Sequence, residues 1–156
     1  MPSHAEKNQT EIKNYYRIID PEERLSENEK AEEERKVLAN MPACFPAALR
    51  YVMTRFGFTQ EALAFESKVS ESTISRYRNG KVKSFSEKNV VALCVAMHLP
   101  PWLSFALIAK AGFSLAATKE QLAHLMILNC MYMRSIDEVN EYLRERGTDS
   151  LSRETA

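Results

Sequence analysis

The chain has 156 residues, of which 21 are basic and 21 acidic, so its formal net charge is zero. This length favours one domain with an appended subdomain and supplies enough apolar residues for a core. No apolar run approaches the roughly 18 residues of a membrane helix, and the start lacks the apolar centre of a signal peptide. We therefore expect a cytoplasmic protein that does not contact a membrane.

The charges are unevenly distributed along the chain. Residues 1–40 hold seven Lys and Arg against ten Asp and Glu, and residues 118–156 hold five against seven. Residues 41–117 hold nine basic against four acidic residues. A basic middle between acidic flanks fits a contact between the middle of the chain and nucleic acid.

Residues 1–40 form a charged N-terminal extension, expected to be partly helical or disordered. One local apolar cluster either docks on the body or a partner, or belongs to a disordered tail; it consists of Ile12, Tyr15, Tyr16, Ile18 and Ile19. Ser26 and Glu29 then form a capping box, which predicts a charged helix to about Asn40. Leu38 and Met41 are its expected anchors.

The basic middle, residues 41–117, begins after this extension at Pro42 and Pro46. Leu49, Val52, Met53 and Phe56 recur at helical spacing and predict its first helix, which Gly57 ends. Thr59 is a good N-cap for a second helix of about two turns, in which Leu63 and Ala64 form the buried face. Such a short helix requires support from neighbouring helices.

A third helix is predicted to begin after Ser70, whose hydroxyl can accept an amide proton from Ser72 or Thr73. Val69, Ile74 and Tyr77 are expected to face inward. The outward positions are Glu71, Ser72, Ser75 and Arg76, together with Thr73. Small polar side chains allow close approach to the DNA major groove, and an arginine can donate two hydrogen bonds to a guanine edge.

Basic residues follow the end of this helix. Asn79 and Gly80 both tolerate the left-handed conformation and end it. Lys81 and Lys83 come next, where each can neutralise a DNA phosphate.

The stretch Thr59–Lys83 resembles the helix-turn-helix of the phage-repressor/Cro-like (Xre-type) family, whose pattern is roughly T-Q-x-x-L-A, a short turn, V-S-x-S-T-I-S-R and N-G-K. The matching residues are Thr59, Gln60, Leu63, Ala64, Val69, Ser70, Ser72, Thr73, Ile74, Ser75, Arg76, Asn79, Gly80 and Lys81. The chain departs from the family at Lys68, because glycine is usual in that turn. Lysine there adopts a positive φ at a cost of roughly 1 kcal/mol.

The resemblance implies a lambda-repressor-like bundle of five helices and a role for each polar position. The residues that it places at base edges are Glu71, Ser72, Ser75 and Arg76. The residues that it places at the DNA backbone are Gln60, Thr73, Asn79, Lys81 and Lys83. Gln60 is also implied to brace the helix Ser70–Arg78, which would lie in the major groove.

Two more helices complete the middle of the chain. Ser84 and Glu87 form a capping box for the fourth. Pro100 and Pro101 end that helix and begin the fifth, since proline suits a first helical turn. Trp102 and Phe105 in the fifth helix read as core rather than as a partner surface. The five helices together span about 45–111.

A helical hairpin is predicted at 118–147. Thr118 and Gln121 form a capping box for an apolar helix that needs burial on several sides, and Ser135 with Glu138 begins a second helix, which Gly147 ends. The hairpin either covers the bundle or forms a two-fold interface with a second copy, and we favour a homodimer because one helix contacts few base pairs. Residues 148–156 are expected to be a disordered tail.

Nothing in the sequence indicates catalysis, a cofactor or a small-molecule effector. Cys44, Cys94 and Cys130 read as reduced core residues, and the histidines lack zinc-ligand spacing with them. No catalytic motif or phosphate-binding glycine loop is present, which disfavours an enzyme.

We therefore predict an all-α, sequence-specific DNA-binding regulator of transcription, a repressor rather than an activator. The alternative is a helix-turn-helix scaffold that serves as a protein-interaction or sensing module. Glu71 does not decide between them, because a carboxylate repels phosphate but can accept a proton from a cytosine amino group.

Overall fold

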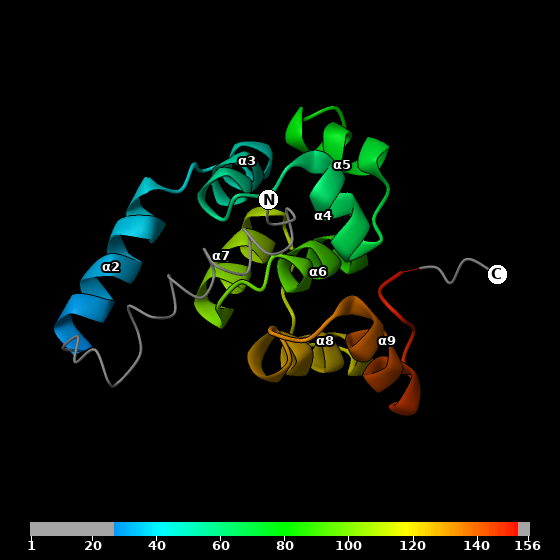
Figure 1. Ribbon diagram of the computed structural model, residues 1–156. Helices are drawn as coiled ribbons and strands as arrows, with labels where there is room; N and C mark the ends of the chain where they lie inside the picture. The colour runs from blue at the N-terminus through cyan, green and yellow to red at the C-terminus, as the bar shows by residue number, and fades with distance from the viewer. Residues whose placement is uncertain (1–26, 153–156) are drawn as a thin grey trace, which may run out of the picture.

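The protein is described by a computed structural model for residues 27–152, and these residues form eight helices and no strand (Figure 1). The helices are α2 (Glu27–Asn40), α3 (Phe45–Arg55), α4 (Gln60–Ser67), α5 (Glu71–Arg78), α6 (Glu87–Ala96), α7 (Pro101–Lys110), α8 (Lys119–Cys130) and α9 (Ile136–Glu145). The predicted all-α class is confirmed, and α3–α7 are the five expected helices. The apolar cluster 12–19 and the cap at Ser26 lie outside the described residues.

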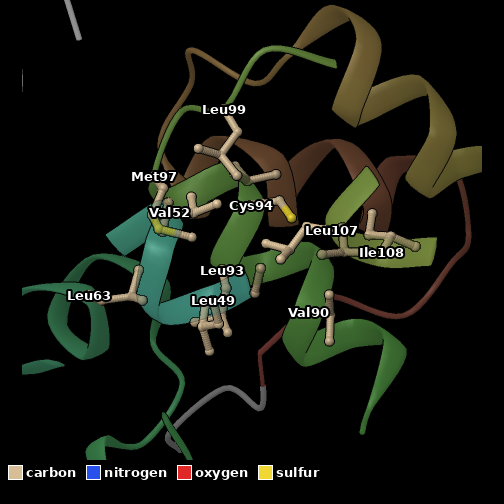
Figure 2. Close-up of a cluster of buried hydrophobic side chains, with 14 of the residues drawn as sticks. Leu49, Val52, Leu63, Val90, Leu93, Cys94, Met97, Leu99, Leu107 and Ile108 are labelled. Atoms are coloured by element: carbon tan, nitrogen blue, oxygen red, sulfur yellow. The ribbon is translucent and has the colours of Figure 1, made fainter. Parts of the chain in front are cut away.

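Helix α6 lies at the centre of the core. Every residue from Val90 to Met97 is buried, and α4, α7, α8 and α9 all pack against this helix. Figure 2 shows Leu49 of α3, Leu63 of α4 and Leu107 of α7 around it. A helix that is apolar on every side is stable only when covered on every side, which fixes its central position. No helix in the described range is long and apolar enough to cross a membrane.

The cap of α6 differs from the prediction. Ser86, not Ser84, is the N-cap, and its hydroxyl accepts a hydrogen bond from the amide of Asn89 at 3.4 Å. Both serines precede an acceptable helix start, so sequence spacing alone did not separate them. Glu87 is consequently in the first turn of α6 and points towards α8.

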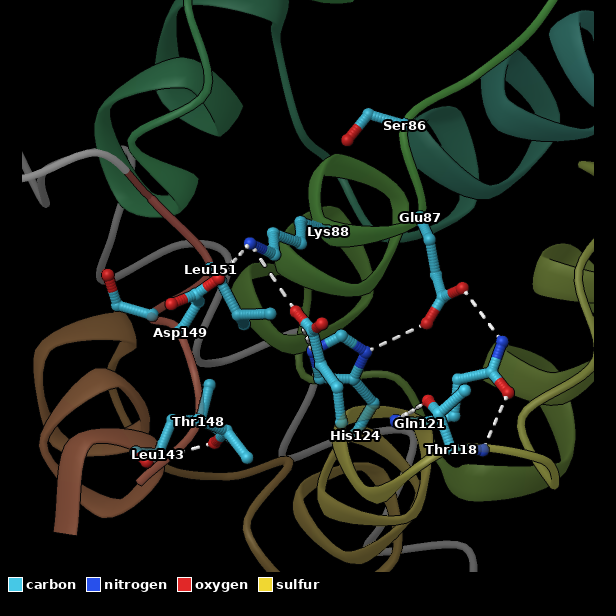
Figure 3. A network of polar contacts seen from close by, with 12 residues as sticks. Ser86, Glu87, Lys88, Thr118, Gln121, His124, Leu143, Thr148, Asp149 and Leu151 are labelled. Carbon is cyan, nitrogen blue, oxygen red and sulfur yellow. Dashed lines mark hydrogen bonds and ion pairs between the residues drawn. The ribbon is translucent and has the colours of Figure 1, made fainter. Parts of the chain in front are cut away.

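A polar network joins α6 to α8 and to the C-terminal segment (Figure 3). Glu87 accepts a hydrogen bond from Gln121 at 3.2 Å and lies 3.0 Å from Nδ1 of the buried His124. The Lys88 ammonium lies 3.1 Å from Asp149 and 3.4 Å from Glu120. Burial lowers the pKa of Lys88, but these two carboxylates outweigh it, so the pKa ends above its ordinary value.

Helix α2 is anchored differently from the prediction. Val37 and Met41 are buried, whereas Leu38 is 42% exposed. Arg55 of α3 also forms an ion pair with Glu33 of α2 at 3.2 Å. Leu38 was therefore the wrong anchor, because one residue along a helix turns the side chain by about 100°.

Helices α8 and α9 cover the bundle. Ile127, Leu128, Ile136, Val139 and Leu143 are all buried, and the helices pack on α6, with α8 also touching α7. The predicted caps are confirmed: Thr118 and Gln121 form a complete capping box, and Ser135 accepts from the Glu138 amide at 3.2 Å. The expected burial of α8 on several sides is wrong, however.

The outer face of α8 is open. Leu122 and Met126 are about half exposed, and Met133 in the following turn is exposed to a similar extent. The exposed thiol of Cys130 lies between Met126 and Met133 in the chain. In the fifth helix of the bundle, Trp102 and Phe105 are half-buried against the core.

Part of the predicted disordered tail is ordered. Leu151 is buried, and its amide donates to the Asn140 side-chain oxygen at 2.8 Å. The Asn140 amide group donates to the Ser152 hydroxyl, also at 2.8 Å. Both hydrogen bonds involve the side chain of one buried asparagine in α9. The polar composition of 148–152 therefore did not reveal that this segment packs against the helix.

The three cysteines are expected to react differently with a thiol reagent at neutral pH. Cys94 is buried, and burial raises the pKa of its thiol to about 12 against a smaller lowering by Ser104. Cys44 and Cys130 are exposed, so their assignment to the core was wrong. Since the thiolate is the nucleophile, we expect Cys44 and Cys130 to react in the native protein and Cys94 only after denaturation.

Counting the thiols modified before and after addition of guanidinium chloride measures this difference. A Cys94→Ala variant should lose the thiol that is protected in the native state, and Cys44→Ser should lose one that is accessible. Rapid modification of all three thiols in the folded protein would contradict the buried position of Cys94.

Candidate nucleic-acid interface

Helices α4 and α5 are joined by a tight turn with the predicted caps. The Thr59 hydroxyl accepts from the amide of Ala62 at 3.1 Å, and the Ser70 hydroxyl accepts from that of Thr73 at 3.2 Å. Lys68 between the helices is left-handed with φ 60°, as its place in the turn predicted. Each cap satisfies an amide that would otherwise lack a partner, which allows two helices of only eight residues each to form.

The inner face of α5 is fixed by apolar and aromatic contacts. Ile74 and Tyr77 are buried, as predicted. The Tyr77 ring lies 6.1 Å from the ring of Phe45 and 5.1 Å from that of Phe85. Its hydroxyl accepts from the Ser86 amide at 3.0 Å and from the Asn89 side chain at 3.2 Å. Tyr77 therefore connects α5 to α3, to the loop before α6 and to α6 itself.

The outer face of α5 carries the four residues predicted to meet base edges. Glu71, Ser72 and Arg76 are exposed, and Ser75 is half-buried. Their spacing in the helix places them on one side. Glu71 lies in the first turn, where a carboxylate also stabilises the positive end of the helix dipole.

The five residues predicted to contact the DNA backbone lie on α4, on α5 and in the segment after α5. Asn79, Lys81 and Lys83 are exposed just after α5, where Gly80 has φ 67°. The Asn79 side chain donates to the Ser75 hydroxyl at 3.4 Å. Thr73 is half-buried, and its hydroxyl lies 2.7 Å from that of Ser70. Part of the hydrogen-bonding capacity of Thr73 is therefore used within the cap.

Gln60 braces α5 through an arginine that sequence reasoning did not single out. The Gln60 side-chain oxygen accepts from Nη1 of the half-buried Arg78 at 3.1 Å. Arg50 of α3, also missed, donates to the backbone oxygen of Arg78. These contacts join residues 18 and 28 positions apart, so only the folded chain reveals them.

Lys68, the departure from the family pattern, contacts the C-terminal hairpin. Its ammonium forms an ion pair with Asp137 at the start of α9. Lysine therefore supplies a contact that glycine at this position would lack. Both side chains are largely exposed, so the pair contributes at most about 1 kcal/mol.

The described part of this surface holds no cluster of metal-binding side chains. Within residues 27–152, no group of three or more His, Cys, Asp and Glu side chains is placed to hold a metal ion. Exposed basic side chains near α5 include those of Arg50, Arg76, Lys81 and Lys83. This combination of cations and small polar side chains suits an anionic polymer.

Comparison with protein families matches residues 49–101 to a model described as helix-turn-helix. The comparisons with curated proteins and with solved structures found no match. The matched residues run from within α3 to the start of α7 and contain the whole α4–α5 pair. The match implies DNA binding and indicates a regulator of transcription. Residues 49–101 therefore match a helix-turn-helix family, which agrees with the resemblance to the phage-repressor/Cro-like pattern.

Proposed function

We propose that this protein is a sequence-specific transcriptional repressor that reads the major groove with the helix Ser70–Arg78. The observation that carries the proposal is the two-sided character of α5: Ile74 and Tyr77 fix its inner face, while its outer face presents Ser72, Ser75 and Arg76. A rigidly held helix with short polar side chains can approach base edges closely. Arg76 is then placed to reach a guanine.

In this proposal Glu71, Ser72, Ser75 and Arg76 contact bases. Gln60, Thr73, Asn79, Lys81 and Lys83 contact the DNA backbone and set the position of α5 in the groove. Gln60 can use its amide nitrogen for phosphate because its oxygen already accepts from Arg78. Glu71 accepts from a cytosine amino group, the base-edge donor that suits a carboxylate.

Selection of bound sites from random duplex DNA tests this function. We expect enrichment of one palindromic sequence, because two copies related by a two-fold axis read two equivalent half-sites. In vitro transcription from a promoter that overlaps the selected site should fall when the protein is added, as expected of a repressor. An increase in transcription would identify an activator instead.

A second candidate function is a protein-interaction module that uses the helix-turn-helix as a scaffold. Phe65 on α4 favours this candidate, because it is 81% exposed and lies close in the chain to the proposed DNA surface. An aromatic side chain that remains in water is a frequent anchor in protein interfaces. Failure of the selection to enrich any sequence would favour this candidate over DNA reading.

The proposed repressor acts as a homodimer, and we expect the outer face of α8 to form the contact. Leu122, Met126 and Cys130 follow one another at four-residue intervals, so they share a face that bears no charge between them. Met126 is 48% exposed. Two identical uncharged faces can pack without repulsion between like charges.

Met126→Glu is expected to convert the dimer to monomer in sedimentation, because the substitution places one charge from each copy in the contact. Leu38→Glu, at an exposed leucine of α2, is the matched control. A thiol-specific cross-linker should join two wild-type chains through Cys130, and Cys130→Ser should abolish the product while Cys44→Ser retains it. The reverse pattern would locate the contact near Cys44.

A further inference from the structure

A groove lies between the start of α5, the start of α6 and the C-terminal segment. Its volume is about 910 Å³, within the range of small-molecule sites. Lys68, Ser70 and Thr73 line one side, Lys88 and Asn89 a second, and residues 149–152 a third. Segments more than 60 positions apart in the chain therefore form its walls.

The lining suits an anion that also carries hydroxyl groups. It combines two lysines with serine and threonine hydroxyls and the Asn89 amide, and Asp149 is the one carboxylate among the lining residues that the structure describes. Lysine is a frequent phosphate ligand, and hydroxyl and amide groups can both donate to phosphate oxygens. The hydroxyl and amide groups gathered around two ammonium groups are the feature that selects this class of ligand.

Both lysines are held by carboxylates that a ligand can replace. Lys88 lies 3.1 Å from Asp149, whose side chain is 80% exposed, and 3.4 Å from Glu120. Figure 3 shows the Lys88 and Asp149 side chains facing each other. Lys68 pairs with Asp137, whose side chain is 75% exposed. Exposed ion pairs of this kind contribute little stability, so replacing the carboxylate with another anion costs little free energy.

We propose that this groove binds a small phosphomonoester, with Lys88 and Lys68 neutralising the phosphate and the hydroxyls of Ser70 and Thr73 donating to it. A DNA backbone is a poorer occupant, because a duplex brings a row of phosphates past the carboxylates of Asp137 and Asp149. A single small anion can displace the exposed Asp149 carboxylate while Glu120 stays beside Lys88. The assignment of the ligand class is independent of the proposed repressor function.

Occupancy would connect the start of α5 to the C-terminal segment. The ligand would touch Ser70, the N-cap of α5, and would release Asp149 from Lys88. Because α5 is the proposed DNA-reading helix, a bound phosphomonoester would act on the orientation of that helix. This last step rests on the proposed function, whereas binding itself does not.

Glycerol 3-phosphate, titrated into the full-length protein without DNA, is the test of binding. We expect a saturable calorimetric signal and a rise in Tm, and neither with glycerol at the same concentration and ionic strength. Lys88→Ala should weaken binding about tenfold through loss of a charge-assisted hydrogen bond. Asp149→Asn should strengthen it, because the competing carboxylate is removed while Lys88 stays.

Opposite changes in affinity for Lys88→Ala and Asp149→Asn distinguish a specific site from a general effect of ionic strength. Lys36→Ala, at an exposed lysine of α2, should leave the affinity unchanged; equal losses in Lys36→Ala and Lys88→Ala would overturn the proposal. Absence of a saturable signal in the wild type would also overturn it. Where Lys88→Ala does not fold, Asp149→Asn decides: higher affinity supports the site, and unchanged affinity overturns it.

A duplex of random sequence distinguishes the two possible sources of phosphate. Suppose that the duplex competes with glycerol 3-phosphate and that Lys88→Ala lowers the affinity for both ligands to the same extent. The groove then binds the DNA backbone, and the small-molecule assignment is wrong. Retention of glycerol 3-phosphate on the DNA-bound protein supports the assignment. If the protein binds no DNA at all, the titration with glycerol 3-phosphate still decides the groove.

Discussion

Arg76→Ala is expected to weaken binding to the selected operator by about 5- to 150-fold, the range for loss of one bidentate contact to guanine. Arg76 is exposed on the outer face of α5, and its side chain makes no contact that fixes the helix in the bundle. The Tm should therefore stay near that of the wild type. Fluorescence anisotropy on operator and on random duplexes separates a loss of base reading from a general loss of DNA affinity.

The control for this result is a pair of substitutions that acts on every sequence alike. Replacing Lys81 and Lys83 by alanine should weaken operator and random DNA equally and lower the slope of log K against log salt by about two. Arg35→Ala, at an exposed arginine of α2, should change neither quantity. Unchanged operator affinity in Arg76→Ala would remove this residue from direct base reading.

Leu143→Ala is expected to lower the free energy of unfolding by about 2 to 5 kcal/mol and the Tm by roughly 10 °C. Leu143 of α9 is 0% exposed, and α9 packs on α6 at the centre of the fold. The substitution leaves a cavity where the hairpin meets the DNA-binding bundle. Thermal unfolding followed by circular dichroism measures the loss.

The shape of the unfolding curve carries further information. Since α8, α9 and α6 share buried side chains, the loss should appear as a shift of one cooperative transition. A separate early transition of the hairpin would contradict this shared core. Leu38→Ala, at a leucine that is largely in water, should change stability by less than about 0.5 kcal/mol.

The shared core also determines how the dimer should be tested. Truncation after Leu115 would remove the cover of α6 along with any interface, so a change in mass would not distinguish dissociation from unfolding. Met126 avoids this difficulty because its side chain is on the open face of α8. A substitution there changes the outer surface and leaves Ile127 and Leu128 in the core.

Short-range signals in the sequence predicted most of the DNA-binding bundle. Thr59, Ser70, Thr118 and Ser135 are N-caps as expected, because a cap depends on groups two or three residues away. The buried positions of Ile74 and Tyr77 followed from helical periodicity. The cap at Ser84 was wrong by two residues, since nearby serines offer the same local chemistry.

Contacts between distant residues were not predictable in the same way. The brace from Gln60 to Arg78 and the tie from Lys68 to Asp137 each join two helices. The docking of Leu151 depends on a single buried asparagine in α9. A periodic pattern states that a helix has an apolar face, but it does not identify which neighbour covers that face.

The sequence by itself determined the helices of the bundle, the helix-turn-helix and the outward face of α5, because caps, periodicity and turn residues act over a few positions. Only the tertiary structure decided that the hairpin covers α6, that α8 keeps an open apolar face, and that the C-terminal segment closes a groove beside Ser70 and Lys88. The physical reason is that burial and ion pairing depend on which surfaces meet. Lys68 belongs to both levels: its turn was evident in the sequence, and its partner was not.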